Sequence, residues 1–230
     1  MAKKNKTKKR VKIKYKKILI FLLVLLFIFV ITKILLSLKI TNIYISGNDY
    51  FKEQEIIEFA GIQNYPEIIN TLPNKLTKKL LKQPEIKKVK ISHKNFTKLY
   101  ITITENKPLF YNDVTKKTIL ENKKEIEKDY EAPILLNYVP DKKYKEFIEK
   151  MSKIELNIIK RISEIKYNPN DKDDGRFLLT MNDGNYVYLT LDRFTSINKY
   201  LDIMVEISSK FDNQKGVLYL DSGKYFKVLE

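Results

Sequence analysis

Residues 18–38 read ILIFLLVLLFIFVITKILLSL, and this apolar stretch decides how the rest of the chain is organised. At about 1.5 Å of rise per residue, a helix of this length is roughly 31 Å long, which matches the hydrocarbon core of a bilayer. A surface helix of a soluble protein keeps a polar face, and residues 18–31 have none. The sequence therefore predicts one transmembrane helix over residues 18–38.

The alternative is a cleaved signal peptide, because a charged segment precedes an unbroken apolar run of 14 residues. The segment after that run, TKILLSLKI, offers no small-x-small cleavage site, so we expect an uncleaved anchor. Residues 1–17 form a basic tail with ten Lys or Arg residues, and the first acidic residue of the chain is Asp49. By the positive-inside rule, we expect the N-terminus in the cytoplasm and residues 40–230 on the outer side of the membrane.

The formal net charge of +16 is unevenly distributed. The first 48 residues hold twelve basic and no acidic residues, which leaves 32 basic against 28 acidic residues for the remainder. Lys-rich segments bind polyanions through counterion release, so nucleic-acid binding by the tail stays open as an alternative. Its position beside the predicted span favours a topology signal that also touches anionic lipid, and we expect no nucleic-acid partner.

The residue types needed for many catalytic and metal sites are missing from this sequence. The chain has no cysteine, and His93 is its only histidine. These counts exclude thiolate metal sites, multi-histidine metal centres and zincin motifs. There is also no Gly-rich phosphate loop, nucleophile elbow or paired-carboxylate motif. We therefore expect no enzyme, cofactor, metal or small-molecule substrate, and we interpret His93 as a solvated strand residue.

The chain after the span alternates between strand and helix patterns. Lys39–Ser46 predicts a strand, Phe51–Ala60 an amphipathic helix that ends at Gly61, and residues 73–82 a second short helix. Alternating runs around residues 86–91 and 99–103 predict two further strands. We expect a core in which Ile56, Phe59 and Leu80 lie between the helices and one sheet face, formed by Ile43, Ile45, Val89 and Ile101.

Three fragments of this unit together carry a resemblance. They are Ile43-x-Ile45-x-Gly47-Asn48, then Pro84-x-Ile86-Lys87-x-Val89-x-Ile91, then Leu99-x-Ile101-x-Ile103-x-Glu105-x-x-Pro108. With a Lys-rich tail and one span directly ahead, their order resembles the POTRA module of the FtsQ/DivIB family of bacterial division proteins. Lys52 stands where this family often has Ser or Thr to cap the first helix, so we expect Asp49 as the cap, or none.

The resemblance implies an α+β fold in four parts. These are a cytoplasmic basic tail (1–17), a transmembrane helix (18–38), a POTRA-like βααββ module (39–110) and a second, β-sheet-rich mixed α/β domain (111–230). In the second part of the chain, residues 109–111 and 118–120 could pair as strands, and a helix is predicted from about Asp141.

Stronger signals return after residue 160. A strand is expected from Ile162, a hairpin around Asn182-Asp183-Gly184, one helix over residues 194–211 and a strand over residues 216–221. These features resemble the β domain of DivIB. Asp171-Lys172-Asp173-Asp174-Gly175 suggests a calcium loop, but the Gly falls one position early and no Glu stands at position 12, so a turn is the better interpretation.

The resemblance implies a non-catalytic scaffold of the division complex at the septum, bound to small single-span partners similar to FtsL and to DivIC/FtsB. The alternative is a membrane-anchored POTRA-type chaperone or export factor without a division role. By the same resemblance, the segment after the last Asp-Ser-Gly turn forms a sheet edge that takes a strand from the DivIC/FtsB-like partner. The residues given this partner-binding role are Ser222, Gly223, Lys224, Tyr225 and Phe226. A frayed terminus is the competing interpretation of this segment.

Overall fold

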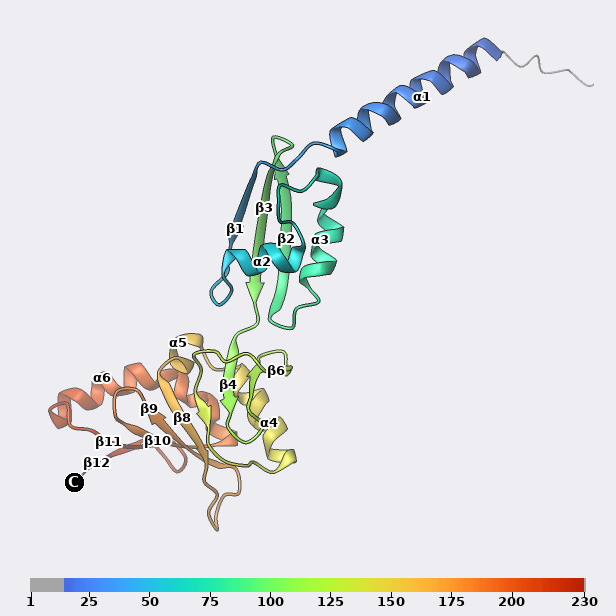
Figure 1. The fold of residues 1–230 in the computed structure, drawn as a ribbon. Helices are drawn as coiled ribbons and strands as arrows, with labels where there is room; N and C mark the ends of the chain where they lie inside the picture. Colours follow the sequence, from blue (N-terminus) through green and yellow to red (C-terminus); the bar gives the residue numbers. More distant parts are fainter. Residues whose placement is uncertain (1–14, 230) are drawn as a thin grey trace, which may run out of the picture.

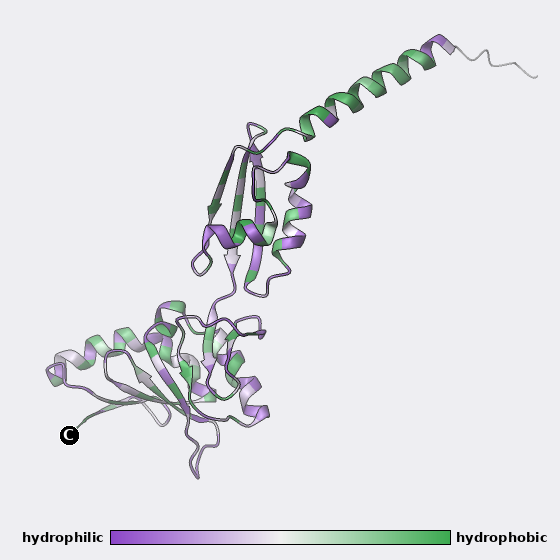
Figure 2. Cartoon of the chain, in the orientation of Figure 1, coloured by the Kyte–Doolittle hydropathy of each residue, from purple (hydrophilic) through white to green (hydrophobic). Residues whose placement is uncertain are grey.

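The protein, a computed structural model, is described over residues 15–229 and consists of one helix followed by two domains (Figure 1). The helix α1 (Tyr15–Leu36) buries none of its side chains and is apolar along most of its length (Figure 2). It is long and apolar enough to cross a membrane once. The predicted span is therefore a helix, which ends at Leu36 instead of Leu38. Most of the predicted basic tail lies outside the described residues.

The proximal domain, residues 38–106, has two helices packed on a three-stranded sheet. In the sheet order β1-β3-β2, β1 runs parallel to β3 and β2 runs antiparallel to it. The predicted order strand, helix, helix, strand, strand is confirmed. Its elements are β1 (Asn42–Ser46), α2 (Glu53–Ala60), η1 (Ile68–Asn70), α3 (Pro73–Leu80), β2 (Ile86–Lys94) and β3 (Lys98–Glu105).

The core of the proximal domain lies between the helices and the sheet. Ile56 and Leu80 are fully buried there, and Ile101 meets them from the central strand. Phe59, which we expected in this core, is only half-buried and packs edge-on against Phe51 at 5.3 Å between ring centroids. Helical spacing placed Phe59 on the correct side of α2 but could not show that its ring lies at the rim.

The interpretation of His93 as a solvated residue is wrong. The side chain points to the helix-covered face of β2 and is half-buried, and Nε2 lies 2.9 Å from Oγ1 of the fully buried Thr71. Burial lowers the pKa of His93, because the cationic form loses hydration there. Sequence patterns do not indicate this contact, because Thr71 lies in a loop.

Two glutamates fix the start of α2. The Glu55 carboxylate accepts the backbone N–H of Lys52 at 2.8 Å, and Glu105 accepts the N–H groups of Asp49, Tyr50 and Phe51 at 2.7–3.1 Å. Burial raises the pKa of Glu105 and outweighs these hydrogen bonds, which act to lower it. The helix begins after Lys52, so Asp49 is not its cap.

The distal domain, residues 107–229, is built on a nine-stranded sheet in the order β12-β11-β10-β9-β8-β7-β4-β5-β6. Its first strand begins at Pro108, ahead of the boundary at residue 110 that we expected. Its elements are β4 (Pro108–Asn112), β5 (Lys117–Leu120), β6 (Glu125–Ile126), β7 (Ile134–Leu135), α4 (Asp141–Ser152), α5 (Leu156–Ile159), β8 (Ile162–Tyr167), β9 (Arg176–Met181), β10 (Tyr186–Thr190), η2 (Leu191–Lys199), α6 (Tyr200–Phe211), β11 (Gly216–Tyr219) and β12 (Tyr225–Val228).

Several elements expected in this domain are confirmed. The strands β4 and β5 pair, α4 begins at Asp141, and β9 and β10 form a hairpin whose turn holds Gly184 at φ +87°. The one helix expected over residues 194–211 is instead a 3₁₀ segment, η2, followed by α6. Side chains three residues apart share a face in both helix types, so apolar spacing alone did not separate them.

The two domains contact each other through the loop that follows β6. Lys128 reaches from this loop to the proximal domain, where Nζ lies 2.9 Å from Glu55 Oε1 and 4.8 Å from the ring centroid of Phe51. Tyr130 packs edge-on against Tyr50 at 5.4 Å between centroids. The loop therefore acts as a side-chain clamp between the domains.

Candidate functional site

The strand β12 lies at one edge of the distal sheet, next to the C-terminus (Figure 1). It pairs antiparallel with β11 over four residue pairs, from Tyr219 with Tyr225 to Gly216 with Val228. Within residues 15–229, no strand lies on its other side. The frayed terminus considered as an alternative is therefore not what the structure shows for residues 225–228.

The register shows which backbone groups of β12 are free. In an antiparallel pair, residues that bond the neighbouring strand alternate with residues whose N–H and C=O groups point away. The N–H of Leu229 donates to the carbonyl of Lys215 at 2.9 Å, so Lys227 and Tyr225 share this inward orientation. The N–H and C=O groups of Phe226 and Val228 therefore face outward from the sheet edge. Such groups can pair with an added strand.

The side chains of β12 divide between two faces of the sheet. Phe226 packs against the distal core and lies 5.5 Å from Phe211 of α6, centroid to centroid. On the other face, the ring of Tyr225 stacks on Tyr219 at 4.4 Å, and Tyr219 stacks on Tyr188 at 5.3 Å. Tyr225 is 51% exposed and has no stacked ring on its outer side among the described residues. The tyrosine row therefore ends with an open ring face at the sheet edge.

Gly216 lets β12 approach β11 closely. A Cβ atom at this position would collide with the Phe226 ring and with the backbone oxygen of Lys227. Gly216 lies opposite Val228 in the register, at the first position of β11 and in the last pair of the contact between the two strands. The absence of a side chain at Gly216 is therefore a condition for the position of β12.

The turn before β12 is fixed by Asp221. Its Oδ2 pairs with Arg176 Nε at 2.7 Å, and its Oδ1 accepts the backbone N–H of Ser222 at 2.8 Å. Burial acts to raise the pKa of Asp221, but the hydrogen bonds from Arg176 and Ser222 outweigh it and lower the pKa. The Arg176 guanidinium also lies 3.6 Å from the ring centroid of Tyr188. This ion pair thus joins the turn to the tyrosine row.

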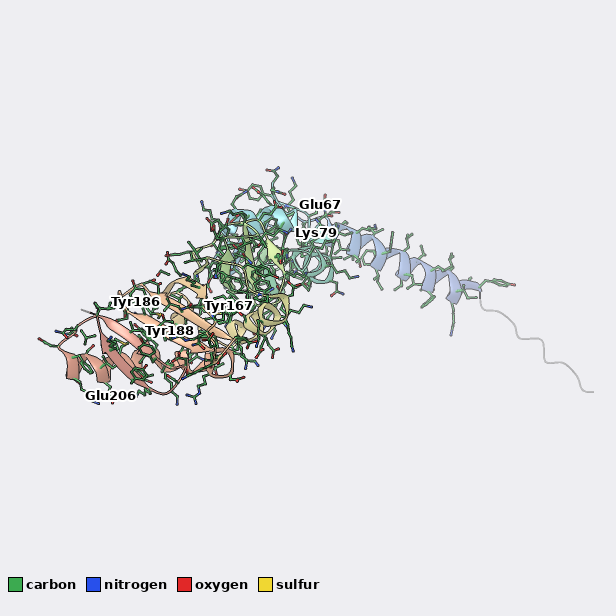
Figure 3. The ribbon with its side chains drawn as sticks, turned by 90° about the horizontal axis from the view of Figure 1, so that it is seen from below. Glu67, Lys79, Tyr167, Tyr186, Tyr188 and Glu206 are labelled. Atoms are coloured by element: carbon green, nitrogen blue, oxygen red, sulfur yellow. The ribbon has the colours of Figure 1, made fainter. Side chains whose placement is uncertain are left out.

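Lys224 ties the same turn to α6. Glu206, labelled in Figure 3, accepts hydrogen bonds from Lys224 at 2.8 Å and from Lys210 at 2.9 Å. These two bonds lower the pKa of Glu206 to about 2, so its carboxylate is charged at neutral pH. Beside the turn lies an open groove of about 460 Å³, whose lining includes Arg193 and Lys199 together with Gly223 and Lys224. Arg193 and Lys199 make the lining of this groove basic.

The five predicted partner-binding residues are consecutive but occupy two kinds of structure, a turn and a strand. Ser222, Gly223 and Lys224 form the turn, while Tyr225 and Phe226 begin the edge strand with side chains on opposite faces. Sequence reasoning missed Tyr188 and Tyr219, although each lies in an alternating run of a predicted strand. It also missed Arg176, which comes close to the turn only through the sheet.

In the acidic loop at residues 171–175, the carboxylates of Asp173 and Asp174 bind neighbouring protein groups. Asp173 Oδ1 accepts the N–H of Gly175, and Asp174 Oδ1 pairs with Lys143. Over residues 15–229, no cluster of acidic or histidine side chains has an arrangement suited to a metal ion. The features that remain for function are the open strand edge, the tyrosine row and the basic groove.

Comparisons with known proteins agree with this architecture. Residues 38–106 match the family model described as POTRA domain, FtsQ-type. The cell division protein DivIB of Bacillus subtilis (strain 168) is 30% identical over 197 residues, which cover 82% of this chain and 74% of the relative. DivIB of Listeria monocytogenes serovar 1/2a is 27% identical over 197 residues, covering 82% of this chain and 72% of the relative.

Among solved structures, the chain is similar to the major extracytoplasmic domain of DivIB from Geobacillus stearothermophilus, in its trans isomer. The match has 20% sequence identity and a TM-score of 0.36, and it covers 47% of this chain and 96% of that domain.

Proposed function

Because this chain belongs to the DivIB family of bacterial cell-division proteins, we propose that it is a membrane-anchored, non-catalytic scaffold of the division complex. Its edge strand β12 binds a small single-span partner similar to DivIC/FtsB, and an FtsL-like protein joins the same assembly. Family membership favours this role over that of an export chaperone.

The observation that carries the proposal is the open edge of β12. An added strand gains main-chain hydrogen bonds from the outward groups of Phe226 and Val228, and pockets for alternate side chains give specificity. Many sheet edges are blocked by a proline, a bulge or a covering loop. β12 carries no proline, and its pairing with β11 has no register shift. This edge is therefore open to pairing.

The surroundings of β12 define the chemistry of the partner. A planar side chain, aromatic or Arg, on the added strand would stack on the open face of Tyr225 and extend the tyrosine row. Acidic side chains next to that strand would face Arg193, Lys199 and Lys224 in the basic groove. We therefore expect the partner strand to be extended, with a planar side chain in register with Tyr225 and acidic residues to one side.

The proposed location follows from α1 and the basic tail. α1 is exposed on all sides in the structure, so a bilayer would cover its apolar surface. The excess of Lys and Arg before it directs the N-terminus to the cytoplasm and both domains to the outer side. A fluorescent fusion to the N-terminus should gather at midcell, and an even distribution around the membrane would contradict the division role.

A pair of substitutions at Val228 tests the edge directly. Val228→Pro removes an outward N–H that β11 does not use, whereas Val228→Ala keeps it and shortens the side chain. Full-length variants are purified from membranes together with the small single-span proteins that they capture. We expect V228P to lose the DivIC-like partner and V228A to keep it. Equal capture by the two variants would contradict strand addition at β12.

A further inference from the structure

Two loops of the proximal domain share an unusual feature at one end of the domain. Asn64 and Tyr65 in one loop, and Asn95 and Phe96 in the other, all have positive φ angles of 49–59°. Asn adopts this left-handed conformation readily, but a bulky aromatic residue does so at a cost in free energy. Both rings are nevertheless directed into solvent, with Tyr65 69% and Phe96 66% exposed. Strained backbone that exposes an apolar ring points to a function for that ring.

Both loops bind the segment that leaves α1. The N–H of Ile40 donates to the carbonyl of Pro66 at 2.8 Å, and the N–H of Thr41 donates to the carbonyl of Thr97 at 2.9 Å. A third bond joins Ile68 N–H to the carbonyl of Leu38. Pro66 directly follows Tyr65, and Thr97 directly follows Phe96. The two aromatic residues are therefore held close to the end of the apolar stretch 18–38. In Figure 1, the β2–β3 turn and the end of α1 lie at the same end of the proximal domain.

The distance from the membrane is short enough for contact. Ile40 follows Leu38 by two residues, so an extended chain separates them by at most about 7 Å. The headgroup region on each side of a bilayer is about 5–8 Å thick. Residues 39–41 would lie in this region, and the side chains of the loops whose backbone carbonyls bond Ile40 and Thr41 would reach it.

The charge at this end of the domain is also suited to a lipid surface. Lys39 follows the span, and Lys94 and Lys98 flank the loop of Phe96 as the last residue of β2 and the first residue of β3. Glu67, labelled in Figure 3, is an acidic residue of the other loop. Nζ of Lys94 lies 4.8 Å from the ring centroid of Tyr100, next to the loop of Phe96. Lysine binds anionic headgroups, and aromatic rings are enriched at membrane–water interfaces.

We propose that the loops of Tyr65 and Phe96 dock on the bilayer that α1 crosses, with both rings in the headgroup region and Lys39, Lys94 and Lys98 on anionic lipid. This inference rests on the membrane span of the proposed function. The contact holds the proximal domain against the bilayer instead of leaving it on a free tether, and it thereby fixes the direction in which the distal domain projects.

The chain has no tryptophan, which makes the test selective. The full-length protein is reconstituted into vesicles of phosphatidylcholine with or without phosphatidylglycerol. The lipids carry bromine on the acyl chains both near the headgroup and near the chain ends, so that the headgroup side and the centre of the bilayer are both sampled. Three single-tryptophan variants are compared. F96W reports on the loop, F29W in α1 is the positive control, and Y138W is the control for the distal domain, where Tyr138 is 64% exposed.

We expect strong quenching of F29W, clear quenching and a blue-shifted emission for F96W, and neither effect for Y138W. Adding K94Q and K98Q to F96W should at least halve its quenching in vesicles with phosphatidylglycerol. Emission of F96W equal to that of Y138W, with F29W quenched, would overturn the docking and leave the span intact. An unquenched F29W would overturn the span and the docking with it. Quenching of F96W that is insensitive to anionic lipid would overturn the role of the lysines.

Discussion

Replacing Gly216 by Ala tests the packing of β12 against β11. The added methyl would collide with the Phe226 ring and the backbone oxygen of Lys227, so one of the two strands has to move. Overpacking of this kind costs about 1–3 kcal/mol. This cost has an upper limit, because β12 can detach from β11. Detachment would expose Phe226 and lose roughly the 1.5–3 kcal/mol that burying a Phe side chain contributes. We therefore expect Gly216→Ala to destabilise the distal domain by about 1–3 kcal/mol.

Gly223 provides a matched control. A Cβ at this position would have no atom within 4 Å, and its φ is not in the left-handed region. Gly223→Ala should therefore change the unfolding free energy by less than about 0.5 kcal/mol. Calorimetry of the full-length protein in detergent should show the distal transition lowered by about 4 °C per kcal/mol for Gly216→Ala. Equal midpoints for the two variants would refute the close approach of β12.

Three further predictions concern the proximal domain and the clamp. Burial lowers the pKa of His93, so the neutral ring is favoured in the folded state and its contribution to stability is complete above about pH 6.5. This contribution should be lost as the pH falls through and below that value. Thermal melts at falling pH should show a smaller drop in midpoint for His93→Gln than for the unsubstituted protein. Ile56→Ala should cost about 2–5 kcal/mol because Ile56 is fully buried, and chemical denaturation should show a smaller cost for the half-buried Phe59→Ala. Lys128→Ala should remove an exposed ion pair and a cation–π contact, together worth about 1–2 kcal/mol. The amides of residues 50–55 should then exchange hydrogen faster in Lys128→Ala than in Lys128→Arg, which keeps the positive charge.

The parts of the fold that the sequence predicted are those with local patterns. Alternation of apolar residues indicated β2 and β3, helical spacing indicated α2 and α4, and Asp183-Gly184 indicated the β9–β10 hairpin. Each pattern is set by neighbours within a few residues. The same patterns could not show that Phe59 lies at a rim, because burial depends on which elements cover a position.

The site depends on contacts that local patterns do not contain. Asp221 pairs with Arg176, 45 residues earlier in the chain, and the row of Tyr188, Tyr219 and Tyr225 exists only in the observed register. The strand β11 joins β10 in parallel after the crossover through α6, so no short turn fixes their register. The edge itself was expected from the family resemblance, while the outward direction of the Phe226 and Val228 amides required the structure.

The central claim is that a partner strand pairs with the outer side of β12, and residue-resolved amide hydrogen exchange of the full-length protein tests it most directly. Without the partner, the inward amides of Lys227 and Leu229 should exchange more slowly than the outward amides of Phe226 and Val228. Adding the DivIC-like partner should slow exchange at Phe226 and Val228 by at least tenfold. Unchanged exchange at these two amides in a partner-saturated sample would contradict the account.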